Sequence, residues 1–84
     1  MSVYKLRVVL EPQPEGGYTI TCPLIPGLVT EADTLDEVAP HVADALAALI
    51  EGYAELKRPL PAGLQPITPD TPIWIETLIT VAME

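Results

Sequence analysis

The sequence predicts an α+β protein in which one helix lies on one face of a four-stranded mixed sheet. Three short stretches before residue 32 and one after residue 72 alternate apolar and polar side chains, as strands with one buried face do. Between them, residues 35–56 repeat apolar side chains in steps of three and four, the period of an amphipathic helix. The predicted order is therefore β-β-β-α-β, and residues 1–84 are expected to form a single domain.

Residues 3–11 and 17–22 are the first two predicted strands. Their apolar faces consist of Tyr4, Leu6, Val8 and Leu10 in the first, and of Tyr18, Ile20 and Cys22 in the second. Gly16 and Gly17 lie between them, and adjacent glycines accept the positive φ that a two-residue hairpin turn requires. We therefore expect an antiparallel hairpin. Cys22 is the only cysteine, so it can form no disulfide within the chain and is expected to be a small buried side chain.

A third, edge strand and the start of the helix follow. Pro23 ends the second strand, and Pro26-Gly27 turns the chain into residues 28–31, which are short enough for an edge strand. Thr34 and Glu37 have the spacing of a capping box, in which each side chain binds the backbone amide of the other residue. The helix is thus predicted to begin at Leu35.

The predicted helix has two apolar stripes. The stripe expected to face the sheet contains Leu35, Val38, Val42, Leu46, Leu49, Tyr53 and Leu56. The second, which we call the alanine stripe, contains Ala39, Ala43, Ala47, Ile50 and Ala54. The two together are wider than the ~100° that suffices for docking on one sheet. The alanine stripe is therefore a candidate for self-association, unless it packs beneath the segment after the helix. Pro40 is expected to bend the first two turns or to delay the regular helix until after it.

The rest of the helix surface is acidic. Its carboxylates are Glu37, Asp44, Glu51 and Glu55, which form a candidate partner interface, and His41 lies among them as an expected solvated side chain. Lys57 and Arg58 suit the negative end of the helix dipole, so the helix is predicted to end there, before Pro59.

Residues 59–72 hold five prolines and are predicted to be a Pro-rich crossover into a final strand, residues 73–81. A right-handed crossover would lay this strand parallel to the first one, which gives the sheet order 3-2-1-4. One face carries Ile73, Ile75, Ile79 and Val81, and the other carries Trp74, Glu76, Leu78 and Thr80. Trp74 and Leu78 would lie on the uncovered sheet face and join the candidate partner interface. With one charge and no proline, this strand also invites edge pairing with another chain, so we expect a homo-oligomer.

Charge restricts the classes of partner. The net charge is −8, with four basic residues against twelve acidic ones, whereas nucleic-acid affinity depends on Lys and Arg. We therefore expect no direct nucleic-acid binding, while a basic protein partner is compatible. No apolar run reaches the ~18 residues of a membrane helix, and residues 1–5 begin no signal peptide, so a cytoplasmic protein without membrane contact is expected.

The sequence offers little for catalysis. His41 is the only histidine and has no evident nucleophile beside it. The acidic residues Asp33, Asp36 and Glu37 at the helix start are explained by the positive end of the helix dipole. The helix carboxylates point away from the predicted sheet, so they cannot build a two-metal nuclease centre with it. We expect a protein that is not an enzyme and that needs no metal or cofactor.

Three motifs follow one another at close spacing. They are Gly-Gly-Tyr at 16–18, Pro-x-x-Pro-Gly at 23–27 and Asp-Thr-Leu-Asp-Glu at 33–37. Over roughly residues 3–62 this order resembles the N-terminal domain of HicB-like antitoxins, although Ala32 stands where that family usually has glycine. The resemblance implies a truncated ribonuclease-H-like sheet. It also implies an antitoxin that binds and occludes a HicA-like toxin, a small basic ribonuclease that cleaves mRNA.

Two other functions stay open. Many members of that family continue into a DNA-binding domain, whereas this sequence ends three residues after Val81, so an autoregulator of transcription would need a DNA-binding element on a separate chain. The other alternative is an orphan homo-oligomer that has no toxin and serves as a structural or ligand-sensing module. A reading frame for a small basic protein beside the gene would favour the antitoxin.

Overall fold

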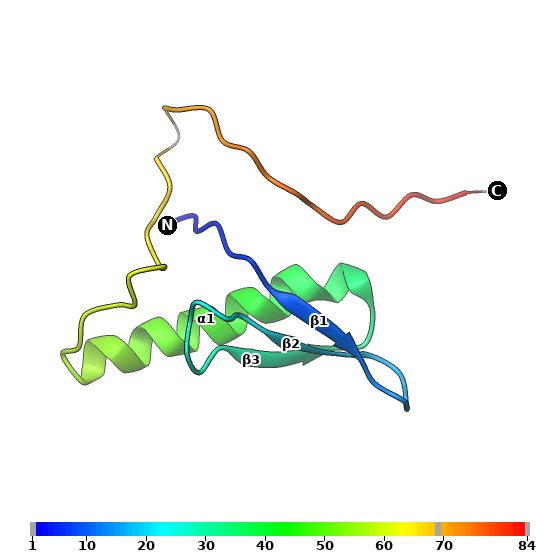
Figure 1. The fold of residues 1–84 in the computed structure, drawn as a ribbon, viewed down its shortest axis with the longest axis horizontal. Helices are drawn as coiled ribbons and strands as arrows, with labels where there is room; N and C mark the ends of the chain where they lie inside the picture. The colour runs from blue at the N-terminus through cyan, green and yellow to red at the C-terminus, as the bar shows by residue number, and fades with distance from the viewer. Residues whose placement is uncertain (1, 69, 84) are drawn as a thin grey trace.

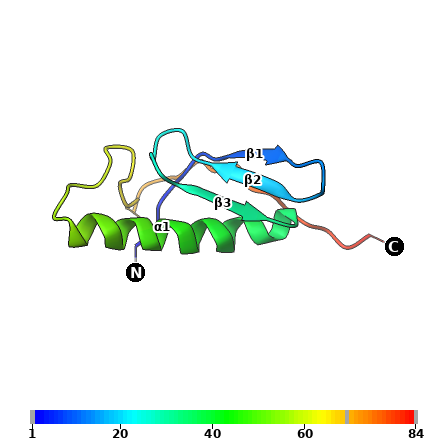
Figure 2. The same cartoon turned by 90° about the horizontal axis from the view of Figure 1, so that it is seen from below.

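The computed structural model describes residues 2–68 and 70–83 and contains one sheet and one long helix (Figure 1). Strands β1 (Val9–Pro12), β2 (Tyr18–Thr21) and β3 (Val29–Ala32) form an antiparallel sheet in the order β1-β2-β3. A 3-10 turn, η1 (Leu35–Glu37), leads into α1 (Val38–Glu55). Figure 2 shows α1 along one face of the sheet. The α+β class and the order of the first three strands are therefore confirmed.

The hairpin between β1 and β2 is present, but its turn is longer than predicted. Leu10 lies opposite Ile20, and the last paired residues are Pro12 and Tyr18. The loop therefore spans residues 13–17, in which the Gly16 amide donates to the Gln13 carbonyl at 3.0 Å. Pro14 occupies the second position of this turn, where its fixed φ is favoured. The two-residue turn at Gly16-Gly17 was thus wrong, although both glycines do adopt positive φ.

The core lies between the sheet and α1, and its inward strand positions follow the predicted alternation. The two ends of the predicted sheet-facing helix stripe do not reach it, because Leu35 is 43% and Leu56 is 67% exposed. One cluster of buried residues contains Cys22, Ile25, Leu28, Leu46 and Leu64, and a second contains Ile20, Ala32 and Val38. Cys22 is buried as expected. Leu64 comes from the Pro-rich crossover and is only 1% exposed, so it fastens that segment to the hydrophobic core.

The helix starts through the predicted capping box, but in two stages. The Glu37 carboxylate accepts hydrogen bonds from the amides of Thr34 (3.2 Å) and Asp33 (3.0 Å). Residues 35–37 form the 3-10 turn, and α geometry begins at Val38. Pro40 is then the third residue of α1, where an N–H would have no intrahelical partner. The regular helix consequently begins before Pro40, and not after it as one of our two alternatives required.

The helix ends at Glu55, earlier than predicted, in a Schellman motif. The Arg58 amide donates to the Tyr53 carbonyl at 3.0 Å, and the Lys57 amide donates to the Ala54 carbonyl at 3.1 Å. This arrangement requires a left-handed residue at Lys57, whose φ is +55°. Glycine is the usual residue there, and because lysine occupies the site the sequence gives no signal for the motif.

Replacing Lys57 by glycine is expected to raise the free energy of unfolding by about 0.5–1 kcal/mol, because glycine adopts left-handed geometry without the Cβ clash. Lys57→Ala removes the same charge but keeps a Cβ, so it should bring no such gain. Urea unfolding of both variants measures the difference. Equal stabilities for the two would show that the backbone at residue 57 carries no strain.

The predicted fourth strand is not part of this sheet. Residues 73–81 are extended and exposed and form no ladder with β1, so the order 3-2-1-4 and the ribonuclease-H-like sheet were wrong for the described chain. The first strand is also shorter than expected, because β2 is only four residues long and can pair β1 no further back than Val9. Residues 3–8 instead meet the crossover through a single bridge between Tyr4 and Pro66. Pro69, within the predicted crossover, lies outside the described residues.

Candidate interaction site

An open apolar groove of about 730 Å³ lies between α1 and the chain that precedes β1. One wall comes from the helix and the preceding turn, with Leu35, Val38, Ala39, Val42, Ala43, Leu46, Ala47 and Ile50. The facing wall comes from residues before β1, among them Tyr4, Leu6 and Val8, and the rim includes Glu76, Thr77, Leu78 and Thr80. Three segments that are distant in the sequence thus form one site, which we call the groove.

Most of the alanine stripe belongs to this groove. Ala39, Ala43 and Ala47 are exposed in it, Ile50 is half-buried there, and Ala54 lies outside it. The alternative that the stripe packs beneath the Pro-rich crossover does not hold for Ala39, Ala43 and Ala47, because all three are exposed. Ile50 does pack against the core cluster that contains Leu64 of the crossover. Small side chains at these positions allow another segment to approach the helix backbone closely.

Sequence reasoning missed the facing wall of the groove. Tyr4, Leu6 and Val8 were predicted to be covered by the helix, and each is only half-buried. The lengths of the predicted strands do indicate that these residues are not fully covered. The alternating pattern starts at residue 3, whereas a hairpin with residues 17–22 cannot pair that far back. The excess apolar residues therefore need a partner outside the hairpin.

A second surface is the acidic face of α1, which we define as Asp44, Glu51 and Glu55. All three are exposed, and none of them lines the groove. The fourth carboxylate of the predicted interface, Glu37, is half-buried and already accepts two backbone hydrogen bonds. His41 is half-buried as well, and its Nδ1 lies within hydrogen-bonding distance of the Glu31 carbonyl, so it joins α1 to β3 and is not the solvated side chain expected.

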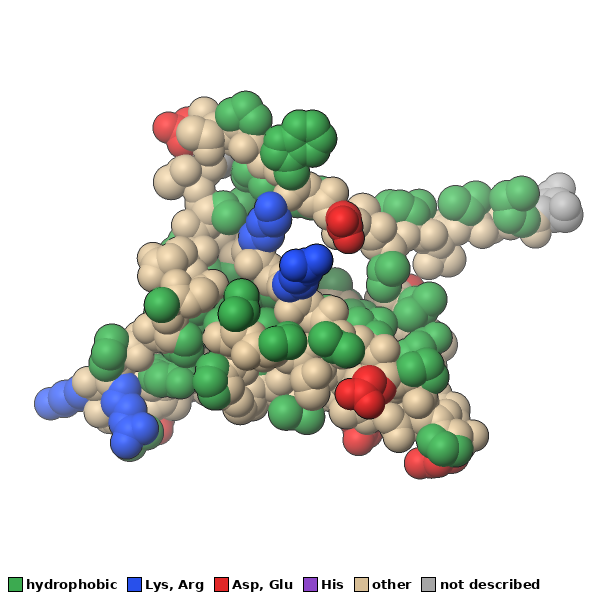
Figure 3. Space-filling view, viewed as in Figure 1, with side chains coloured by type: hydrophobic (Ala, Val, Ile, Leu, Met, Phe, Trp, Pro, Cys, Tyr) green, Lys and Arg blue, Asp and Glu red, His purple; other side chains and the backbone are tan. Residues whose placement is uncertain are grey.

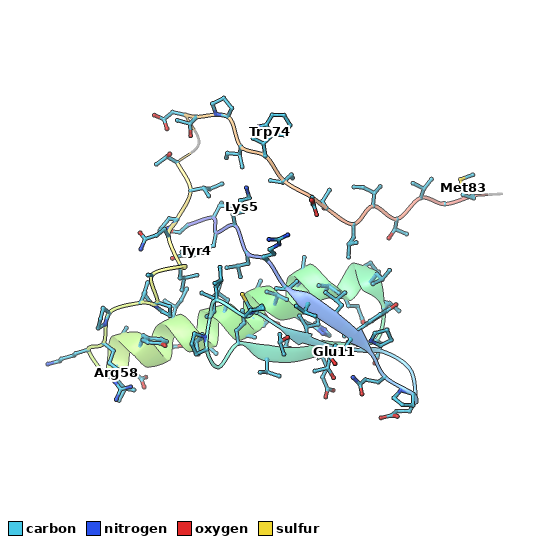
Figure 4. The ribbon with its side chains drawn as sticks, in the orientation of Figure 1. Tyr4, Lys5, Glu11, Arg58, Trp74 and Met83 are labelled. Carbon is cyan, nitrogen blue, oxygen red and sulfur yellow. The ribbon has the colours of Figure 1, made fainter. Side chains whose placement is uncertain are left out.

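Trp74 and Leu78, the other two residues of the predicted interface, lie on the C-terminal segment, residues 73–81. Trp74 is 87% exposed, and Figure 4 shows it away from the sheet and the helix. Leu78 borders the groove and is still 58% exposed. The structure therefore brings Leu78 together with the alanine stripe, and it brings neither residue together with the acidic face.

The arrangement is suited to binding through surfaces. The groove can bury apolar side chains, and the acidic face can attract positive charge. Among residues 2–68 and 70–83, the structure has no cluster of three or more His, Cys, Asp or Glu side chains that could hold a metal ion. None of the helices described there has the length and apolarity to cross a membrane.

Comparison with known proteins finds relatives that cover most of the chain. The UPF0150 protein ssr1765 of Synechocystis sp. is 30% identical over 59 residues, which are 70% of this chain and 75% of that protein. A UPF0150 protein of Archaeoglobus fulgidus is 37% identical over 64% of this chain and 72% of its own length. No protein-family model matches the chain.

A further relative carries a functional name. The protein Antitoxin HicB 1 of Photorhabdus laumondii is 36% identical over 74 residues, which are 86% of this chain. These residues make up 48% of that antitoxin, so the chain spans about half of its length.

Proposed function

Because the chain belongs to the HicB-like family, which includes the UPF0150 proteins, we propose that it is the antitoxin of a toxin–antitoxin pair. The observation that carries this proposal is the 36% identity to Antitoxin HicB 1 across 86% of the chain. Its partner is a small basic HicA-like toxin that cleaves mRNA, and the antitoxin works in the cytoplasm, where that substrate is. Inhibition is steric and electrostatic, with no chemistry contributed by this chain.

The charge of the protein supports a basic partner. A net charge of −8 on 84 residues attracts a positively charged protein over long range and speeds its encounter. On the acidic face, Asp44, Glu51 and Glu55 are exposed along one helix, so they can meet several Lys or Arg side chains at once. A toxin that binds RNA through such side chains would lose its substrate site when they are covered.

The test of the proposed function is a pull-down of the tagged full chain from its native host at moderate salt. Mass spectrometry of the eluate should identify a small basic protein at a fixed stoichiometry. That protein, expressed alone, should arrest growth and degrade mRNA, and co-expression of the antitoxin should restore growth. A basic partner without toxicity, or growth that is not restored, would contradict the antitoxin function.

Reversing the charges of the acidic face is expected to weaken toxin binding at least about tenfold. The carboxylates no longer attract the basic toxin, so association slows, and the new lysines repel it. The variant is Asp44→Lys with Glu51→Lys and Glu55→Lys, and titration calorimetry at low and moderate salt measures it. Glu37 is left unchanged because its carboxylate caps the helix.

The matched control is Glu11→Lys with Glu15→Lys and Asp70→Lys, three exposed carboxylates outside the helix. Both triple variants change the net charge from −8 to −2, so they differ only in where the charges lie. Equal losses of affinity in the two variants would assign the effect to overall charge and remove the acidic face from the interface.

Two observations favour a second candidate, a homo-oligomeric module without a toxin. The groove is open and apolar and the C-terminal segment is exposed, and both features favour self-association even if no second protein exists. A pull-down that returns only this chain would support that module.

A further inference from the structure

The C-terminal segment, residues 73–81, is an apolar strand without a place in its own sheet. Ile75, Ile79 and Val81 are exposed by 67%, 74% and 63%, values unusual for branched apolar residues. The space-filling view shows hydrophobic side chains along the part of the chain that projects from the body (Figure 3). Nine extended residues reach about 30 Å at ~3.3 Å each, which is comparable with the 34 Å width of the molecule. A segment of this kind is stable in water only when another surface covers it.

The groove offers such a surface. Its helix wall is apolar and lined with small residues, and the facing wall is the extended chain before β1. The chain's own Glu76, Thr77, Leu78 and Thr80 also line the groove, so an incoming segment would take their place. Within residues 3–8 the described backbone pairing is limited to the Tyr4–Pro66 bridge and the hydrogen bond from the Ile67 amide to the Val3 carbonyl at 2.9 Å. Residues 5–8 therefore form an extended stretch that leads into β1 beside an apolar groove and has no described backbone partner, and an extended strand can add to such a stretch.

From this complementarity we infer that two copies of the chain exchange their C-terminal segments, each copy placing residues 73–81 in the groove of the other. The added strand pairs with residues 5–8 and covers the exposed part of the alanine stripe. Each copy donates one segment and receives one, so the assembly closes as a two-fold dimer with no free segment. This inference does not depend on a toxin, because the acidic face is not used.

The position of the segment against its own chain argues for a second copy. Glu76, Leu78 and Thr80 border the groove of their own chain, whereas Ile73, Ile75, Ile79 and Val81 are not among the lining residues. The four branched residues of the more apolar face therefore lie outside the groove of their own chain. Figure 1 shows the end of the segment passing beyond the sheet.

The tether also favours exchange. Leu64 is held in the core and Ile67 is bonded to Val3, so the C-terminal segment departs from a fixed point near the start of the chain. Residues 59–72 contain five prolines, and Pro-rich segments are semi-rigid spacers that do not fold back freely.

Light scattering of the purified full chain tests the inference. We expect twice the chain mass of 9.0 kDa, and the same measurement on Ile75→Lys with Ile79→Lys should give the single chain mass. Circular dichroism of this variant should keep the helix signal, because both residues are exposed. The control, Leu24→Lys with Leu56→Lys, changes two equally exposed leucines elsewhere and should stay dimeric. A monomeric wild-type chain, or a dimer that survives Ile75→Lys with Ile79→Lys, would overturn the exchange.

Cysteine cross-linking distinguishes exchange from dimers in which each C-terminal segment stays on its own chain. Ala43 and Leu78 both line the groove, so Ala43→Cys and Leu78→Cys variants, mixed after unfolding together and refolding, should form a disulfide between the two different chains. The chain's own Cys22 is buried and does not compete. In the double variant the disulfide should also join two chains.

A double variant that stays at 9.0 kDa with an internal disulfide would show the segment closing on its own chain. Absence of any disulfide in the mixture would equally contradict the exchange. A wild-type chain that is monomeric alone and gains mass only with a co-purified basic protein would assign the groove to that protein. In that last case the antitoxin proposal would stand and the exchange would fall, so the two can fail separately.

Discussion

Leu64→Ala is expected to lower the free energy of unfolding by about 2–5 kcal/mol, the range for truncating a fully buried leucine. Leu64 is 1% exposed and packs in the cluster with Ile25 and Leu46. Its loss removes apolar burial, leaves a cavity between the crossover and α1, and releases the only buried anchor among the described residues of the crossover. Domains of this size lose about 4–8 °C in Tm per kcal/mol, so thermal unfolding measures the effect readily.

The matched control for this change is Leu60→Ala in the same crossover. Leu60 is 36% exposed, so its truncation should change stability by no more than about 0.5 kcal/mol. Limited proteolysis gives a second readout, because residues 59–68 should become susceptible in Leu64→Ala and stay protected in Leu60→Ala. Similar losses in both variants would mean that the crossover is not held by Leu64.

Gly17→Ala is expected to cost about 1–3 kcal/mol, because two independent features of this residue exclude a side chain. Its φ is +78°, and a Cβ would lie 3.0 Å from the Ala32 carbonyl oxygen in the neighbouring strand. The clash involves backbone of β3, which cannot move without disturbing its pairing with β2. Urea unfolding with a common slope for both proteins measures the loss.

Gly52→Ala is the control with the opposite sign. Gly52 lies inside α1, and a Cβ built there meets nothing within 4 Å. Because glycine is a poor helix former, this change should raise stability by about 0.5–1 kcal/mol. A loss in Gly52→Ala as large as that in Gly17→Ala would show that neither effect comes from backbone conformation.

Part of the candidate site could be predicted from the sequence. Helical periodicity alone placed Ala39, Ala43 and Ala47 together on one surface, because side chains three and four residues apart share a face whatever surrounds the helix. The same rule separated the acidic residues from that surface. Periodicity could not show that Tyr4, Leu6 and Val8 lie opposite the alanines and form a groove with them. The bonds that occupy Glu37 follow from the capping-box spacing and not from periodicity.

Neighbouring residues predicted one end of the helix correctly and the other end incorrectly. Thr34 and Glu37 signal the start of the helix because the bonds that make the capping box join residues three apart. At the other end, Lys57 takes a conformation that glycine normally provides, so the Schellman motif had no signal in the sequence. Because Lys57 suits the negative end of the helix dipole, the helix was predicted to end there, two residues after its observed end at Glu55.

Local signals predicted the hairpin, the edge strand and the amphipathic helix, because alternation, turn residues and capping act between near neighbours. Which strands find a partner, and how deeply each apolar face is buried, depends on contacts between segments that are distant in the sequence. Residues 73–81 have a strand pattern as clear as that of residues 3–11, yet strand pairing requires an edge that the rest of the fold leaves open at the right place. A four-residue β2 and a crossover fastened by Leu64 decide where that edge is and which segment can reach it.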